Sequence, residues 1–357
     1  MEQYIETLPN YMVLVRCYTF NHSAYITDAL NGFTMQHTNF PYVVVMVDDA
    51  SNDGEQEVIK EYIGLNFEIP IFTKDTDYAQ IIYTQHKTNK NCYIAIYFLK
   101  ENHYSKKKKK APYIQPWRNK CKYEALCEGD DYWIDPMKLQ KQVDFLEANP
   151  EYGMVYSNFN IFFQKQKYLK RNVFTKWSLK YPSNYFSLES FILAAGFTCP
   201  PSWLWRTNLP ECPIIQSVDG TFVLFAHFLR ITKVHVLMDV TVNYRILEES
   251  ASHSKDYNKL YVREKNILET QMKLIDYYQL SNDLKMGCLE KYYSSNLLKF
   301  IMYNKTDDII KAKRILVKPE KIDKILFLLN NPIGILILRT LHKIYVFIRN
   351  NSRIILR

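Results

Sequence analysis

The stretch PYVVVMVDDASNDG, residues 41–54, constrains the fold of this chain more than any other. Its unbroken apolar run of valines and Met46 is typical of a strand in a parallel sheet that helices cover on both faces. A shorter apolar strand, Met12–Val15, precedes it, and a helical pattern lies between the two. A second helical pattern and a third strand, EIPIFTK at 68–74, follow it. This βαβαβ alternation predicts an α/β fold with a doubly wound, mostly parallel central sheet flanked by helices.

The rest of the chain predicts where this domain ends. Residues 74–122 interrupt the alternation, and we expect a helical piece at 92–99 followed by a long loop that holds the lysine run 106–110. The segments KYEALC at 122–127 and GMVYSNFNIFF at 153–163 resume the sheet as strands. From about residue 258 onward the pattern is helical, amphipathic and basic. We therefore expect a catalytic domain over 1–257 and a C-terminal helical extension over 258–357.

Charge and cysteine content narrow the compartment. The formal net charge is +9, so the surface should attract nucleotides, other polyanions or an anionic membrane leaflet. The seven cysteines contain no CxxC pair, which argues against a disulfide framework or a zinc site and favours a reducing compartment. The beginning, MEQYIETLPN, is unlike a secretory signal, and no apolar run approaches the roughly 20 residues that span a bilayer. These features predict a cytoplasmic protein.

Two basic segments bear on larger partners. The lysine run is typical of a solvated loop, and nucleic-acid binding would need interleaved aromatic platforms, so we expect no nucleic-acid partner. The C-terminal stretch 324–357 combines many Ile and Leu residues with basic ones, but Arg339, His342 and Lys343 interrupt it too early for a membrane span. It suits peripheral contact with the anionic inner face of the cell membrane. The alternative is a helix hairpin that packs on the catalytic domain or on the second subunit of a homodimer.

Two neighbouring carboxylates, Asp130 and Asp131, follow a strand in ALCEGDDYW, residues 125–133. Such a pair repels and raises the pKa of one member, which is costly unless a cation lies between the two. Mg²⁺ typically binds one or two carboxylates together with substrate phosphates. Ligands of open parallel sheets lie beyond the carboxyl ends of the strands, where the polar loops RCYTFNH and DDASNDG also begin. The pattern therefore predicts a divalent-cation and diphosphate site, with a turn that caps the next helix as the alternative.

Three segments resemble, in this order, the family 2 glycosyltransferases of the GT-A fold, especially the bacterial cell-surface polysaccharide type. They are CYTFNHSAYITDALNGFTMQ, VVVMVDDASNDGEQEVIKEY and ALCEGDDYWIDPMKLQKQVDFLEANPE. The resemblance covers roughly residues 10–255. It implies a nucleotide-diphosphate sugar donor, with UDP expected, and a divalent cation, Mn²⁺ or Mg²⁺. It also implies transfer of the sugar to a hydroxyl of a glycan or lipid-linked acceptor.

The resemblance assigns roles position by position. Asp131 should be the main metal ligand, and Asp130 should face the ribose or the metal. Asp49 should accept the N–H of uracil, and Phe20 should lie against that base. Other donor-binding candidates are Asn21, Ser51, Tyr244 and Arg245. Trp117 and Arg118 belong to a stretch that departs from the family pattern, but they lie just before the acidic strand, so we also expect them at the donor phosphates. His253 is a further candidate metal ligand, although a histidine in a serine-rich loop is more often solvated.

The general base implied by the resemblance is Asp219, which opens a predicted helix in SVDGTFVLFAHFL. The acceptor hydroxyl must lose its proton as its bond to the anomeric carbon forms. A helix cap is the alternative role for Asp219. Together these residues predict a metal-dependent, inverting transfer by a single in-line displacement. Two other functions stay open: a non-catalytic nucleotide-sugar-binding protein, and a sugar nucleotidyltransferase, which would normally carry glycines in the loop RCYTFNH.

Overall fold

The computed structural model describes residues 2–174, 187–196, 199–247, 256–303 and 305–316, together with positions 333, 336 and 340. The chain divides into two compact units. The first comprises Met1–Leu188, Phe197–Ile214 and Asp219–Arg263, and the second comprises Glu189–Gly196, Ile215–Val218 and Glu264–Arg357. The division expected at residue 257 remains a prediction.

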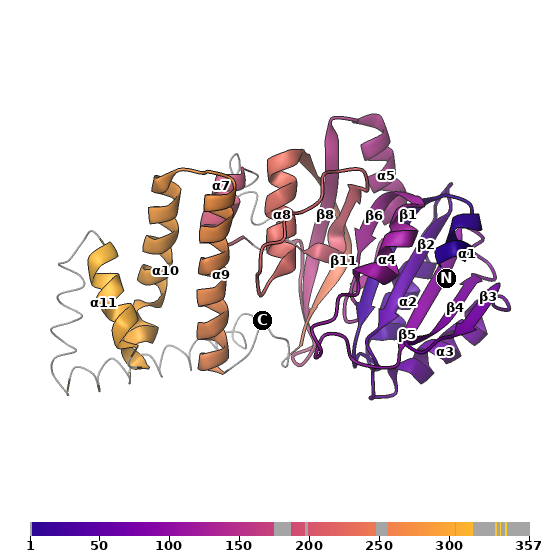
Figure 1. Ribbon diagram of the computed structural model, residues 1–357, viewed down its shortest axis with the longest axis horizontal. Coiled ribbons are helices and arrows are strands. Elements are labelled where there is room, and N and C mark those ends of the chain that lie inside the picture. The colour runs from indigo at the N-terminus through magenta and orange to yellow at the C-terminus, as the bar shows by residue number, and fades with distance from the viewer. Residues whose placement is uncertain are drawn as a thin grey trace. The chain divides into compact units, whose positions relative to one another are not determined.

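The first unit is built on one large sheet (Figure 1). Its strands are β1 (Tyr11–Thr19), β2 (Tyr42–Asp48), β3 (Phe72–Asp75), β4 (Ala79–Gln85), β5 (Cys92–Leu99), β6 (Cys121–Leu126), β7 (Tyr132–Trp133), β8 (Tyr152–Phe163), β9 (Tyr168–Lys170), β10 (Trp203–Arg206) and β11 (Lys233–Ile246). Their order is β3-β4-β5-β2-β1-β6-β10-β8-β11-β7, and β9 pairs with β8. Strands β1, β2, β3, β5, β6, β8 and β11 run in one direction, whereas β4, β7, β9 and β10 run in the other. The predicted α/β fold with a mostly parallel central sheet is therefore confirmed.

Helices cover both faces of this sheet. Those of the first unit are α1 (Glu2–Thr7), α2 (Ile26–Thr34), α3 (Glu55–Asn66), α4 (Ala111–Arg118), α5 (Lys138–Ala148), α8 (Gly220–Ile231) and the start of α9 (Tyr257–Tyr277). On one face, Ile5 of α1 and Ile114 and Trp117 of α4 pack into a buried apolar cluster with the strands. Elsewhere in the sheet, the hydroxyl of Tyr42 in β2 donates to the carbonyl of Phe33 in α2 at 2.7 Å. The valine-rich strands are thus covered as their composition predicts.

Strand β5 corrects the helix expected at 92–99. The segment CYIAIYFL is apolar almost throughout and nearly all buried, so periodicity does not distinguish a strand from a buried helix. Its β-branched and aromatic side chains favour a strand. Its backbone pairs in parallel with β2, where Val45 lies opposite Ala95, and this pairing decides the structure.

The second unit is helical in the part that the structure describes. It contains most of α7 (Leu188–Ala194), most of α9, α10 (Asn282–Met302) and α11 (Thr306–Ile315). Within it, Gln271 of α9 donates to the carbonyl of Ile192 at 2.5 Å, and Lys299 of α10 pairs with Glu264 at 2.9 Å. The expected helical extension is confirmed for these residues. Among the described helices, none is both long enough and apolar enough to cross a membrane.

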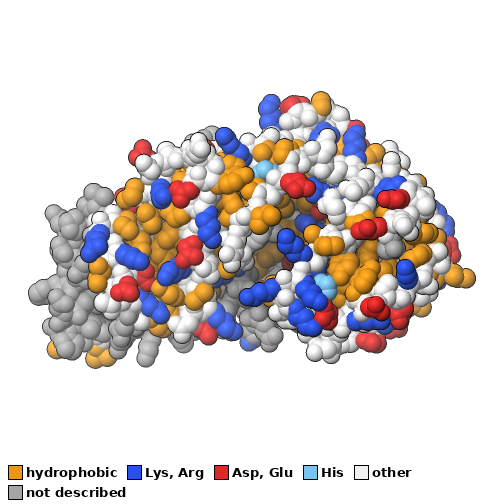
Figure 2. All heavy atoms as spheres, in the orientation of Figure 1, with side chains coloured by type: hydrophobic (Ala, Val, Ile, Leu, Met, Phe, Trp, Pro, Cys, Tyr) orange, Lys and Arg blue, Asp and Glu red, His pale blue; other side chains and the backbone are white. Residues whose placement is uncertain are grey.

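The charges of the described surface are mixed. Basic and acidic side chains both appear on the face that Figure 2 shows, beside scattered hydrophobic ones. Although the chain has a net charge of +9, acidic side chains thus also appear on that face.

Candidate functional site

The carboxyl ends of β2, β1 and β6 lie side by side because these strands are parallel neighbours. The chain passes from β1 to β2 on one side and later enters β6 on the other, so the sheet has a topological switch point beside β1. Loops that follow these three ends carry Asp49, Phe20 and the segment 128–131. Open α/β sheets bind their ligands at such a point.

Asp131 is buried at this edge, and no described Lys or Arg side chain forms an ion pair with it, although the charge of Arg245 acts on it. Only 3% of its surface is exposed, and its Oδ1 accepts a hydrogen bond from the backbone N–H of Arg245 at 2.7 Å. Burial, followed by the charge of Asp130, raises the pKa of Asp131 well above its usual range, although the Arg245 N–H acts in the opposite sense. An additional positive charge at this position would stabilise the carboxylate.

Glu128 belongs to the same acidic group, and the sequence interpretation missed it. The residue is exposed, yet loss of hydration around its carboxyl group and the charge of Asp130 raise the pKa of Glu128 to about 7. The charges of Arg16 and Lys110 act to lower this pKa. Burial raises the pKa of Tyr244 well above its usual range, and the charges of Asp131 and Asp130 add to this effect, so the phenol lies within electrostatic range of both aspartates. The signal for Glu128 was its position two residues before Asp130 at the end of β6.

The oxygen ligands of this group fit a hard divalent cation. Glu128, Asp130 and Asp131 supply carboxylates at one sheet edge, and Mg²⁺ needs only one or two of them when a substrate supplies phosphate oxygens. Within the described ranges, no three His, Cys, Asp or Glu side chains form a preassembled metal site. The arrangement therefore fits a cation that arrives together with a phosphate ligand.

Arg245 holds the acidic turn in place. Its Nε donates to the carbonyl of Asp130 at 2.8 Å, and its Nη2 donates to Asp28 at 2.6 Å. The guanidinium also lies 4.7 Å from the ring centre of Tyr25 and 4.9 Å from that of Tyr132. Because these contacts engage most of its donors, Arg245 is placed to position the acidic turn rather than to reach outward.

A buried glutamate ties together the loops after β1 and β2. Glu55 accepts hydrogen bonds from the hydroxyl of Thr19, from the backbone N–H of His22 at 2.9 Å and from Ser51 at 2.8 Å. The Oγ of Ser51 also accepts the backbone N–H of Asn21 at 2.9 Å. The predicted ligands Asn21 and Ser51 thus lie together at the site edge, where they connect the two loops.

Phe20, the residue that directly follows β1, is 40% exposed, so its ring is open to a flat ligand.

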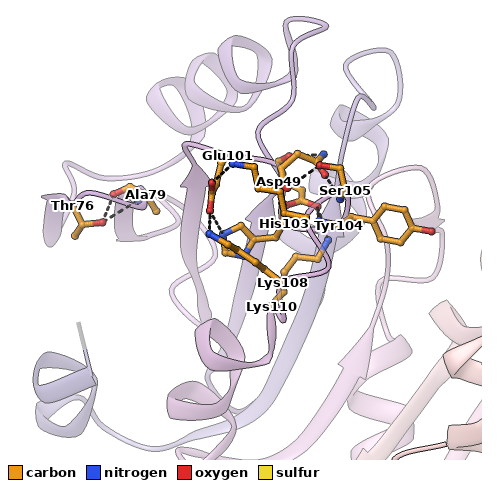
Figure 3. Close-up of polar contacts among 11 residues, drawn as sticks. Asp49, Thr76, Ala79, Glu101, His103, Tyr104, Ser105, Lys108 and Lys110 are labelled. Atoms are coloured by element: carbon orange, nitrogen blue, oxygen red, sulfur yellow. Dashed lines mark hydrogen bonds and ion pairs between the residues drawn. The ribbon is translucent and has the colours of Figure 1, made fainter. Parts of the chain in front are cut away.

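Asp49 binds the loop that follows β5 (Figure 3). Its Oδ1 accepts the backbone N–H of His103 at 2.7 Å, and its Oδ2 accepts that of Tyr104 at 3.1 Å. The ammonium of Lys110 lies 3.0 Å from the same Oδ2. The lysine run is therefore attached to the site edge rather than free in solvent, since Lys106 and Lys108 also pair with Glu101.

Asp219 caps α8 at its N-terminus. Its Oδ1 accepts the backbone N–H of Phe222 at 3.1 Å, and its Oδ2 pairs with Arg263 at 2.9 Å. Its charge raises the pKa of Glu128, so the carboxylate lies within electrostatic range of the acidic group. The capping role is present, and a second role at the site is compatible with this position.

Trp117 and Arg118 lie elsewhere. Trp117 has no exposed surface, and its Nε1 donates to the hydroxyl of Tyr97 at 2.9 Å, so its indole packs the core. Arg118 pairs with the buried Glu124 at 3.2 Å and lines a cavity of about 250 Å³ with Cys121, where β6 begins rather than ends. His253 lies outside the described residues.

Comparisons with known proteins give limited matches. No family model matches the chain. Uncharacterized proteins of Mycobacterium tuberculosis and Mycobacterium bovis are 34% identical over 135 residues, which cover 37% of this chain and 31% of each relative. The match thus spans less than a third of the relatives' own length.

Two solved structures of glycosyltransferases are similar in outline. The S. aureus protein TarS 1-349 in complex with UDP-GlcNAc has a TM-score of 0.47 at 15% identity, over 85% of this chain and 84% of that one. The mannosyltransferase PcManGT from Pyrobaculum calidifontis, in complex with GDP-Man and Mn²⁺, has a TM-score of 0.42 at 12% identity, over 83% and 80%. Likenesses at this level do not carry the activity of those proteins over to this chain.

Proposed function

We propose that this chain is a family 2 glycosyltransferase of the GT-A fold that moves a sugar from a nucleotide-diphosphate donor, with UDP expected, to a hydroxyl. The observation that carries the proposal is the acidic group Glu128, Asp130 and Asp131 at the switch point of a mostly parallel sheet, where the buried Asp131 forms no ion pair within the described part of the chain. A diphosphate with a divalent cation supplies what this group lacks. The three sequence segments that resemble the family meet at this edge.

Asp131 and Asp130 would hold the cation, Mn²⁺ or Mg²⁺, and the phosphate oxygens of the donor would complete its coordination. When bound, the cation offsets negative charge that develops on the departing diphosphate. Phe20 offers an exposed ring to the base of the donor. Arg245 positions the acidic turn through the carbonyl of Asp130, and Tyr244 closes the site beside the aspartates.

Asp219 is the proposed general base. Its carboxylate would accept the proton of the acceptor hydroxyl while the oxygen attacks the anomeric carbon from the side opposite the diphosphate. The Asp219 cap fixes the carboxylate in position, and Arg263 holds its second oxygen. A single displacement of this kind inverts the anomeric centre.

The acceptor we propose is a glycan or a lipid-linked glycan of cell-surface polysaccharide synthesis. The basic C-terminal stretch, most of which lies outside the described residues, would bring the enzyme to the anionic inner face of the membrane, where lipid-linked acceptors are found. A homodimer is the other partner proposed for that stretch.

Calorimetry on the full chain tests the proposal. We expect UDP or GDP to bind more tightly with Mn²⁺ than without it. The variant Asp131→Asn should lose this metal dependence, and it should no longer release nucleotide from donor sugars. The matched control is Asp144→Asn, which changes an exposed aspartate of α5 and should behave as wild type. Nucleotide binding that does not depend on Mn²⁺ would favour a non-catalytic binding protein. Wild-type turnover of Asp131→Asn would show that Asp131 is not the metal ligand.

A further inference from the structure

The lysine run is the sequence feature that the proposed function leaves unused, and the structure gives it an ordered place. Residues 101–110 turn back over the carboxyl end of β2, where Asp49 binds the backbone of His103 and Tyr104 (Figure 3). Asn102 strengthens the attachment, because its side-chain amide donates to the carbonyl of Asp49 at 3.0 Å. Asp49 thus fixes the path of the loop that leads to Lys110.

Asp49 has little capacity left for another partner. Its two oxygens already accept two backbone N–H groups and the ammonium of Lys110, out of roughly four lone-pair positions. Only 1% of its side chain is exposed. A nucleotide base that approached this carboxylate would have to displace the loop.

Lys110, in contrast, lies beside the ends of two neighbouring strands, β2 and β1. Its ammonium lies 5.0 Å from the ring centre of Tyr18 at the end of β1, and its charge acts on Glu128 beyond β6. The side chain keeps 18% of its surface exposed, and an ammonium has three donors, of which Asp49 uses one. The charge of Lys110 thus acts on the acidic group through Glu128, whereas Lys106 and Lys108 pair with Glu101.

We propose that the Lys110 ammonium binds the diphosphate of the donor, and that Asp49 is a positioning residue that holds the loop and aims this ammonium. The proposal rests on the proposed function, because it assumes a nucleotide-diphosphate donor at this edge. It changes the part of the donor that depends on Asp49, from the base to the phosphates. It also predicts that the other lysines of the run contribute little to binding.

The experiment compares nucleoside diphosphates with their nucleosides. Calorimetry with UDP and uridine, and with GDP and guanosine, is carried out in Mn²⁺ on the full-length wild type, Lys110→Met, Lys110→Arg and Asp49→Asn. The matched control is Lys109→Met, which neutralises an exposed neighbour in the same run. Circular dichroism and a thermal melt show whether each variant folds.

We expect Lys110→Met to weaken binding of the diphosphate about 10- to 100-fold, the range of a lost charge-assisted hydrogen bond, and to leave nucleoside binding unchanged. Asp49→Asn should act in the same direction and also spare the nucleoside, while Lys110→Arg and Lys109→Met should stay within a few-fold of wild type. Loss of nucleoside binding in Asp49→Asn would overturn the inference and return Asp49 to the base. Unchanged diphosphate binding in Lys110→Met would also overturn it while the proposed function stands. A wild type that binds neither diphosphate would overturn both.

Discussion

Lys138 provides a test of the energetics of the core beneath the site. It is the first residue of α5, has no exposed surface, and donates to Oε1 of Gln142 at 2.7 Å. Its ammonium lies 4.3 Å from the ring centre of Trp133. Burial lowers the pKa of Lys138 from 10.5 to about 7, although Cys127 and Cys199 act to raise it. A positive charge at a helix N-terminus is also unfavourable.

The pKa of Lys138 sets the size and sign of the expected effect. The unfolded chain binds this proton more tightly, so the free energy of unfolding rises as the pH increases from about 7 to about 10.5. At 1.36 kcal/mol per pKa unit, the group lowers stability by about 4 kcal/mol near pH ~7 and by about 1.5 kcal/mol near pH ~9.5. Lys138→Met removes this cost but leaves Gln142 Oε1 without its donor, which costs about 1–3 kcal/mol.

We therefore expect Lys138→Met to stabilise the protein by about 1–3 kcal/mol near pH ~7, and this gain to fall by about 3 kcal/mol near pH ~9.5. Urea unfolding of both proteins at the two pH values measures the difference. Lys74→Met, which changes an exposed lysine of β3, is the control and should show no such pH dependence. An equal effect of Lys138→Met at both pH values would refute the reasoning, because the buried amine would then keep its ordinary pKa.

Two further predictions concern the site. Asp219→Asn should retain nucleotide binding, since asparagine also caps helices. It should lower turnover about 10²- to 10⁴-fold, measured as nucleotide release with acceptor present. A parallel loss of binding and turnover would argue against Asp219 as the general base. Gly129→Ala should cost about 1–3 kcal/mol in thermal unfolding and weaken Mn²⁺ binding, because the new Cβ would lie 2.8 Å from Cβ of Thr19 at the acidic turn. Full stability of that variant would show that the turn moves easily.

The strands around the site could be predicted because each carries a strong local signal. The valine run of β2 and the polar loops that follow β1, β2 and β6 are visible in the sequence, and parallel pairing then brings those loops together. Periodicity alone could not separate strand β5 from a helix, since a run apolar on every side has no period, although its β-branched and aromatic residues favour a strand. The sequence also predicted that repulsion between Asp130 and Asp131 raises the pKa of one of them. The pKa of Asp131 is raised, first by its burial and then by the charge of Asp130.

The contacts that assign roles to individual side chains could not be predicted, because they join distant parts of the chain. Arg245 binds Asp28, which lies 217 positions earlier, and this contact turns a predicted donor ligand into a support for the acidic turn. Lys110 reaches Asp49 across 61 positions, and a lysine run carries no pattern that indicates such a contact. Trp117 looked available beside Arg118, but the covering of the sheet by α4 takes it into the core.

The hydrogen bond between Asp131 and the backbone of Arg245 has a consequence for biosynthesis. Its donor is encoded 114 positions after its acceptor, so the acidic turn leaves the ribosome well before the strand that steadies it. During that interval the paired carboxylates remain hydrated, and the amino-terminal strands can assemble without the cost of burying them. The turn proposed to hold the cation therefore gains its Arg245 hydrogen bond late in synthesis, when β11 joins the sheet.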